Sequence, residues 1–105
     1  MIPRPEPTPD ALRAALAVVA PGRLDEMQAM KDEAFAKAVE WQSLSPLRSW
    51  ILIWAKEIEI ARRADLSTRY AQAENNLEDE DPAIAREALR ELSAVLEAAM
   101  KAVRE

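Results

Sequence analysis

The sequence predicts an all-α fold, a single small bundle of four to five helices with a proline-rich N-terminal arm. Half of the 105 residues are apolar and 31% are charged, a balance typical of a globular chain. Alanine is frequent and β-branched residues are few, which favours helix over strand. Apolar residues recur at spacings of three and four, and no segment alternates as a strand does.

The arm covers residues 1–8, and every second residue from position 3 to position 9 is proline. Alternating prolines exclude a helix and favour extended polyproline conformations. We expect a mobile tail; the alternative is a strap laid over the helices. Residues 9–105 then form the helical bundle domain. Its first helix begins at Pro9, with Thr8 as N-cap, and ends before Pro21.

Four more helices follow, each with a start signal. The second covers 24–41 and opens with acidic residues that suit the positive end of the helix dipole. Its apolar stripe, which Phe35 widens, consists of Leu24, Met27, Met30, Ala34, Ala38 and Trp41. Ser45 before Pro46 caps the third, which runs to about residue 64. Asp65 caps the fourth, over 66–77, and Asp81 before Pro82 opens the fifth. The apolar face of the fifth helix is broad, which favours packing in a bundle over an exposed dimer zipper.

The third helix is the most apolar segment. One stripe comprises Leu47, Ile51, Trp54, Ile58 and Ala61, and a second comprises Trp50, Ile53 and Ile60. A helix that is apolar on all sides is usually central, so one interpretation is a core helix covered by the others. The other interpretation leaves the second stripe uncovered as a partner interface, where tryptophan and methionine are enriched. Periodicity does not separate the two interpretations, because core and interface residues share the same spacing.

Charge and hydropathy argue against two classes of function, nucleic-acid binding and membrane insertion. The net charge is −5, so the basic footprint that nucleic-acid binding needs is missing, and an anionic membrane surface would repel the chain. The longest apolar run outside the N-terminal region, 50–55, is far shorter than the ~20 residues of a membrane span. The N-terminal region carries acidic residues and prolines where a signal peptide has positive charge, so we expect a cytoplasmic protein.

Catalytic chemistry has few candidates. The chain has no histidine and no cysteine, which excludes imidazole-based catalysis, thiol nucleophiles and Cys/His zinc sites. The carboxylates do not form the paired helical spacings of magnesium-dependent enzymes. We therefore expect no enzyme, no cofactor and no metal. Three arginines, Arg62, Arg63 and Arg69, flank the turn after the third helix; they complement the helix dipole there or contact a small anion.

Three segments resemble a family of small, uncharacterised, all-helical actinobacterial proteins that carry a domain of unknown function. They are Pro-Asp-Ala-Leu-Arg-Ala-Ala-Leu at 9–16, Ser-Pro-Leu-Arg-Ser-Trp at 45–50 and Trp-Ala-Lys-Glu-Ile-Glu-Ile at 54–60. Some members of that family lie near RelE-type toxin genes. The resemblance implies an intracellular helical protein that acts as an antitoxin or as an accessory binding protein.

The expected function is non-enzymatic protein binding, with another protein or a second copy of the chain as the partner. The candidate partner-binding residues are Trp41, Trp50, Ile53, Ile60, Glu78, Asp79 and Glu80. The apolar members would be desolvated anchors, and the acidic members would attract a basic partner. Two alternatives are a self-associating structural protein and a bundle that binds a small ligand. The ligand cavity would be lined by Trp54, Met27 and Met30, with Arg62 or Arg63 at its mouth.

Overall fold

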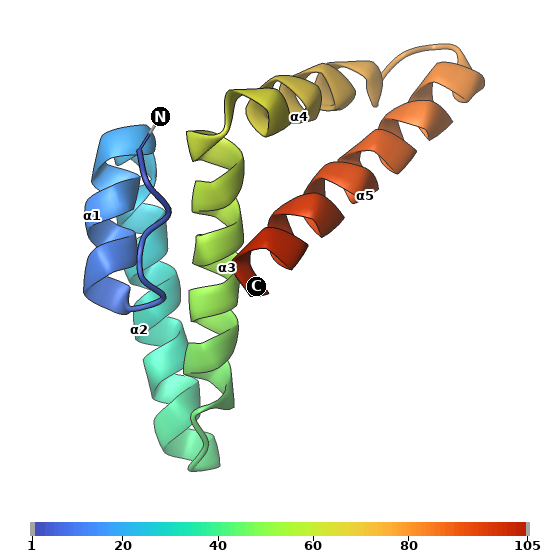
Figure 1. Ribbon diagram of the computed structural model, residues 1–105. Coiled ribbons are helices and arrows are strands. Elements are labelled where there is room, and N and C mark those ends of the chain that lie inside the picture. The colour runs from blue at the N-terminus through green and yellow to red at the C-terminus, as the bar shows by residue number, and fades with distance from the viewer. Residues whose placement is uncertain (1, 105) are drawn as a thin grey trace.

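In Figure 1 the first three helices run up and down side by side, the fourth turns across the top of the third, and the fifth returns obliquely toward the middle of the third. The structure is a computed structural model, and it describes residues 2–104. Over that range it consists of five α-helices and one short 3-10 turn, with no strand, which confirms the all-α prediction. The elements are α1 (Pro9–Val19), the 3-10 turn η1 (Pro21–Arg23), α2 (Leu24–Trp41), α3 (Ser45–Arg62), α4 (Ala64–Asn76) and α5 (Pro82–Arg104).

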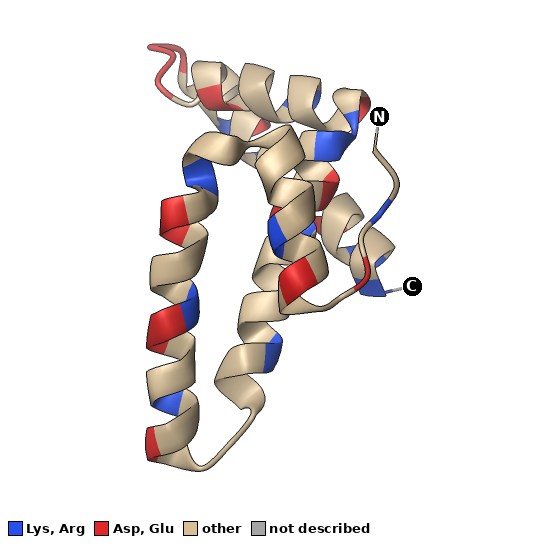
Figure 2. Ribbon diagram, turned by 90° about the vertical axis from the view of Figure 1, so that its left-hand side faces the viewer, with Lys and Arg blue, Asp and Glu red and all other residues tan. Residues whose placement is uncertain are grey.

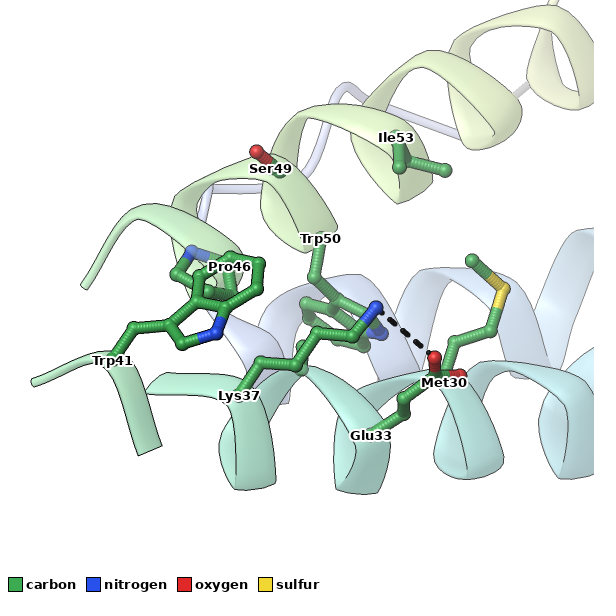
Figure 3. Close-up of a pocket in the computed structure, with 9 residues that line it drawn as sticks. Met30, Glu33, Lys37, Trp41, Pro46, Ser49, Trp50 and Ile53 are labelled. Carbon is green, nitrogen blue, oxygen red and sulfur yellow. Dashed lines mark ion pairs between the residues drawn. The ribbon is translucent and has the colours of Figure 1, made fainter. Parts of the chain in front are cut away.

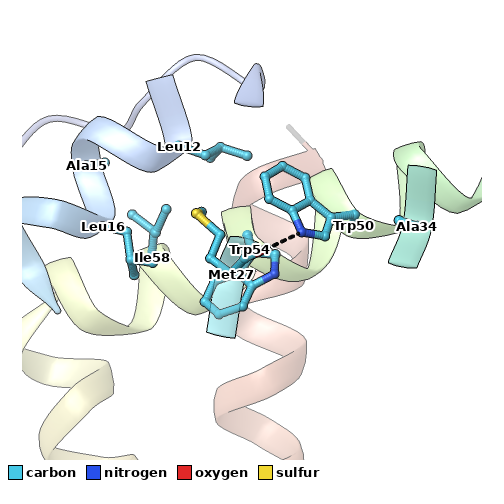
Figure 4. Packing of buried hydrophobic residues seen from close by; sticks show 8 residues of the cluster. All are labelled: Leu12, Ala15, Leu16, Met27, Ala34, Trp50, Trp54 and Ile58. Atoms are coloured by element: carbon cyan, nitrogen blue, oxygen red, sulfur yellow. Dashed lines mark hydrogen bonds between the residues drawn. The ribbon is translucent and has the colours of Figure 1, made fainter. Parts of the chain in front are cut away.

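Helix α3 is central, since it packs against α1, α2, α4 and α5. One core cluster fills the space between α1, α2 and α3 and contains Leu12, Leu16, Met27, Trp54 and Ile58 (Figure 4). A second cluster joins α3 to α4 and α5 through Ile60, Leu66, Val95 and Ala99. The interpretation of the third helix as the core helix is therefore confirmed. Helix α5 packs within the bundle, against α4 and α3.

Two helix starts follow the sequence signals closely. The Thr8 hydroxyl accepts a hydrogen bond from the Ala11 amide at 3.3 Å, so Thr8 is the N-cap of α1 as predicted. At the start of α5 a carboxylate oxygen of Asp81 accepts from the Ala83 amide at 2.9 Å. In both helices the next residue is proline, whose fixed φ suits the first helical position.

The starts of α3 and α4 differ from the prediction by one or two residues. Ser45 is the first residue of α3, and its amide donates to the Ser43 hydroxyl at 3.1 Å. Asp65 does not cap α4: the helix begins at Ala64, so Asp65 lies inside the first turn, where its carboxylate forms an ion pair with Arg63 at 2.9 Å. The chain therefore turns from α3 into α4 with one residue, Arg63, between the two helices.

The N-terminal arm is a strap. Ile2 packs against the first core cluster, and its carbonyl accepts a hydrogen bond from Arg62 at 3.0 Å. Arg4 forms an ion pair with Glu59 of α3 at 2.8 Å. The expectation of a mobile tail is corrected, because charged and apolar contacts to α3 anchor the arm.

No helix in the described range is long and apolar enough to cross a bilayer.

Candidate protein-binding site

The end of the α2–α3 hairpin projects beyond the rest of the bundle. In Figure 1 the loop joining α2 to α3 lies at the foot of the molecule, below the start of α1 and the C-terminal end of α5. The described residues expose seven large apolar side chains, and four of them are here. The exposed fractions are 58% for Phe35, 67% for Val39, 60% for Trp41 and 59% for Leu44. We call the region formed by these four residues the hairpin end.

A tight turn fixes the hairpin end. Gln42 ends α2 in the left-handed conformation, with φ of 51°, which is uncommon for a residue that carries a Cβ. The Ser43 amide donates to the carbonyl of Ala38 at 3.1 Å, so the turn closes back onto α2. Because only three residues separate the helices, α3 returns antiparallel beside α2.

One side of the hairpin carries a groove of about 290 Å³ (Figure 3). Trp50 lies at its base, is 97% buried and donates from its indole Nε1 to the Met27 carbonyl at 3.2 Å. Lys37 and Glu33 form an ion pair of 3.1 Å at its rim. The groove, here called the tryptophan groove, is lined by Met30, Glu33, Ala34, Lys37, Trp41, Pro46, Ser49, Trp50 and Ile53.

A second hollow, of about 330 Å³, has no charged residue in its lining. It is lined by Phe35, Ala38, Val39, Gln42, Ser43, Leu44 and Leu47, and we call it the uncharged face. Three of the four residues of the hairpin end belong to it. Solvent-exposed apolar side chains gathered in this way are typical of a protein interface.

The four apolar residues predicted to bind a partner do not share one surface. Trp41 is exposed at the hairpin end, and Ile53 is partly buried in the tryptophan groove. Trp50 and Ile60 are buried in the two core clusters. Ile60 lies two turns from Ile53 on the same stripe of α3, where Val95 and Ala99 of α5 pack over it. The expectation that Trp50, Ile53 and Ile60 form one exposed patch is therefore corrected.

The predicted acidic residues lie far from the hairpin end. Glu78, Asp79 and Glu80 are exposed on the loop between α4 and α5, at the opposite end of the molecule (Figures 1 and 2). Asp79 has a local role there, because its carboxylate accepts from the Asp81 amide at 2.8 Å. A single compact partner contact cannot include both this loop and the hairpin end.

The arginines near the α3–α4 turn are engaged by carboxylates. Glu59 is 99% buried and receives hydrogen bonds from both Arg4 and Arg62. Burial by itself would raise the pKa of the Glu59 carboxyl, but these hydrogen bonds outweigh it and hold the pKa below its ordinary value. Arg63 is paired with Asp65, so an anion would have to compete with these carboxylates.

The residues proposed for a ligand cavity are also placed differently. Met27 and Trp54 are buried within the first core cluster, and Met30, which packs against that cluster, also lines the tryptophan groove. Arg62 contacts the arm and Glu59, at the other end of α3 from that groove. The predicted cavity with an arginine at its mouth is therefore corrected.

Sequence reasoning missed Phe35, Val39 and Leu44. Phe35 was assigned to the buried stripe of α2, but it faces the uncharged face. A signal was available, because Arg48 is the only charged residue between Glu40 and Lys56 in a chain that is 31% charged.

Within residues 2–104 no three acidic side chains gather as metal ligands. No protein-family model, curated protein or solved structure matches the chain.

Proposed function

We propose that this chain is a non-enzymatic protein-interaction module that binds through the end of its α2–α3 hairpin. The observation that carries the proposal is the exposure of Phe35, Val39, Trp41 and Leu44 together around one turn. Each of these side chains is more than half exposed, although burial of a large apolar side chain contributes about 1.5–3 kcal/mol. A partner that covers them supplies that burial.

The chemistry of the hairpin end specifies the kind of contact. The uncharged face has no charged lining residue, so its partner contributes an apolar, uncharged surface there. Acidic residues that could attract a basic partner cluster at the α4–α5 loop, and that loop is a separate surface (Figure 2). The proposal therefore assigns the affinity to the hairpin end and assigns to Glu78, Asp79 and Glu80 at most a role in steering.

The resemblance of segments 9–16, 45–50 and 54–60 to the actinobacterial family supports an antitoxin-like or accessory role within this class. A cytoplasmic location is part of the same proposal.

The test is a tagged pull-down followed by reconstitution from purified components. Val39→Asp places a charge on the hairpin end, and Val18→Asp is its matched control. Both valines are about two-thirds exposed, at 67% and 65%, but Val18 lies on α1. We expect wild type and Val18→Asp to bind a stoichiometric partner, and Val39→Asp to lose it while retaining its circular dichroism and melting temperature. Equal binding by all three proteins would refute the hairpin end as the site.

A further inference from the structure

Resting on the proposed function, we infer that the protein covering the uncharged face is a second copy of this chain. Two hairpin ends pack against each other about a two-fold axis, and their α2 and α3 helices together form a four-helix arrangement. Phe35, Val39 and Leu44 of each copy lie in the contact. Three observations support the inference: α1 packs on the upper part of the same side of the hairpin, the face carries no charge, and its exposed apolar area is large enough for a weak dimer.

The uncharged face continues a side of the hairpin that another helix covers higher up. Pro9 and Arg13 of α1 line a small hollow together with Gln28 and Lys31 of α2. Phe35 follows Lys31 by one helical turn, and α1 begins at Pro9 and turns away from the hairpin end (Figure 1). The upper half of this side therefore has a third helix packed on it, and the lower half has none. Helices from a second copy complete the lower half in the same way.

Charge favours a copy of the same surface. The chain has a net charge of −5, so two copies repel each other unless they meet where charge is absent or mixed. Residues 41–47 carry no charge at all, and Figure 2 shows the turn at the hairpin end free of charged residues. The positions bordering the face have both signs: Lys31 and Arg48 are one turn from Phe35 and Leu44, and Glu40 adjoins Val39.

A two-fold contact pairs one patch with the same patch on the other copy, so residues near the axis meet their own copies and the others meet a different residue of the patch. A patch of apolar and amide side chains allows this pairing, whereas a patch of like charges brings those charges together. The lining of the uncharged face meets this requirement completely. The tryptophan groove meets it less well, because the Glu33–Lys37 ion pair would have to be covered or broken.

The available area matches a weak dimer. Phe35, Val39 and Leu44 together expose on the order of 300 Å² of apolar surface, and the rest of the face brings each copy to roughly 500 Å². Two copies then bury about 1,000 Å², which is the lower limit of a specific interface. We expect a monomer–dimer equilibrium rather than an obligate dimer.

Sedimentation velocity over a concentration series from about 1 µM to about 1 mM tests the equilibrium. The wild-type chain and Val18→Asp should shift from monomer to dimer across this range, and Val39→Asp should stay monomeric at every concentration. Because Val39 is 67% exposed, its replacement leaves the fold intact, which circular dichroism verifies. A wild-type chain that remains monomeric at the highest concentration overturns the inference, as does a dimer that Val39→Asp does not weaken.

Cross-linking then locates the contact. The chain contains no cysteine, so a single Val39→Cys substitution can form a covalent dimer only with another copy. With a short bismaleimide, Val39→Cys should cross-link in high yield at a concentration where the dimer is populated, and the Val18→Cys control should not. Equal yields at the two positions would mean that the copies meet by collision, and the inference would fail.

The two proposals fail in different ways. If the wild-type chain is monomeric but a purified partner binds it and Val39→Asp loses that partner, the second copy is wrong and the interaction module stands. If Val39→Asp changes neither self-association nor partner binding, both proposals fall.

Discussion

Replacement of Glu59 by glutamine is the sharpest test of how the arm and α3 are held together. The substitution keeps the volume and one acceptor oxygen of the side chain but removes its charge. Glu59 is 99% buried, and its three arginine partners differ in exposure. Arg63 is the most distant of them, at 3.9 Å, and its side chain is 31% exposed. The Arg62 side chain is 10% exposed, whereas that of Arg4 is 44% exposed.

The expected fall in the free energy of unfolding depends on how far each arginine can compensate for the loss of the Glu59 charge. Removing one member of a buried ion pair typically costs about 3–5 kcal/mol, because the remaining charge is left in the protein interior without a partner. Arg4 can return to water, and Arg62 keeps its hydrogen bond to the Ile2 carbonyl at 3.0 Å. Both effects place Glu59→Gln at the low end, about 3 kcal/mol, or a fall in melting temperature of roughly 15 °C.

The assay is urea denaturation followed by circular dichroism, with Glu91→Gln as the control. Glu91 also pairs with an arginine, Arg69, but that pair is solvent-exposed at the junction of α4 and α5. Its removal should cost no more than about 1 kcal/mol. The reasoning is refuted if the free energy of unfolding of Glu59→Gln lies within about 0.5 kcal/mol of the wild-type value, or is no lower than that of Glu91→Gln. In either case the buried ion pair does not stabilise this fold.

The difference in stability between wild type and Glu59→Gln should also depend on pH, in a direction that the pKa of Glu59 determines. Hydrogen bonds from Arg4 and Arg62 hold the pKa of Glu59 below its ordinary value in the folded state. Its contribution is therefore fully present above the unfolded-state pKa, about 4.3, and is lost as the pH falls through the folded pKa. The stability difference between wild type and Glu59→Gln should be constant near neutral pH and shrink in acid below that value. A difference that grows as the pH falls would contradict the assignment.

Three further predictions concern local contacts. Trp50→Phe should cost about 1–3 kcal/mol more than Trp54→Phe in urea denaturation, because the Trp50 indole donates to a carbonyl whereas the buried Trp54 Nε1 has no partner. Asp81→Ala should cost about 1 kcal/mol by loss of the α5 cap, while Glu80→Ala should be neutral by the same assay. Arg4→Ala should cost about 1 kcal/mol and speed proteolysis within the arm, measured by mass spectrometry; an unchanged cleavage rate would argue that the ion pair does not anchor the strap.

Helix positions could be predicted from the sequence where the signal is local. The bounds of α2, 24–41, and the starts of α1 and α5 depend on residues within one turn of each other, and the structure confirms them. The predicted start of α4 was wrong by two residues: the helix begins at Ala64, and the Asp65 carboxylate pairs with Arg63 instead of capping the helix. Capping and ion pairing are both ordinary roles of an aspartate at a helix start. Both interactions are local, and the sequence offers no rule for choosing between them.

The arm illustrates a different limit. Its prolines correctly predict that it is not helical, but they carry no information about what it contacts. Arg4 and Glu59 are separated by 55 positions, so their ion pair exists only because the fold brings α3 beside the arm. Long-range pairing of this kind has no signature in the spacing of either residue.

The sequence could not show which residues of α3 are buried in the core and which lie at the surface, because residues of both kinds belong to the same apolar stripe. Ile53 and Ile60 are two helical turns apart and have the same residue type, yet Ile60 is buried against Val95 and Ala99 of α5, whereas Ile53 is partly buried and lines the tryptophan groove. The neighbours that cover each residue belong to other helices, so the pattern of α3 itself does not contain this difference. The tryptophans are equally ambiguous, since Trp50 is buried and Trp41 is exposed.

The distribution of charge carries the information that periodicity lacks. A helix end that must face water alone is normally kept soluble by charged residues, and residues 41–47 have none. The absence of charge over a turn, rather than the presence of tryptophan, is therefore the sequence feature that points to the surface proposed here to bind a partner.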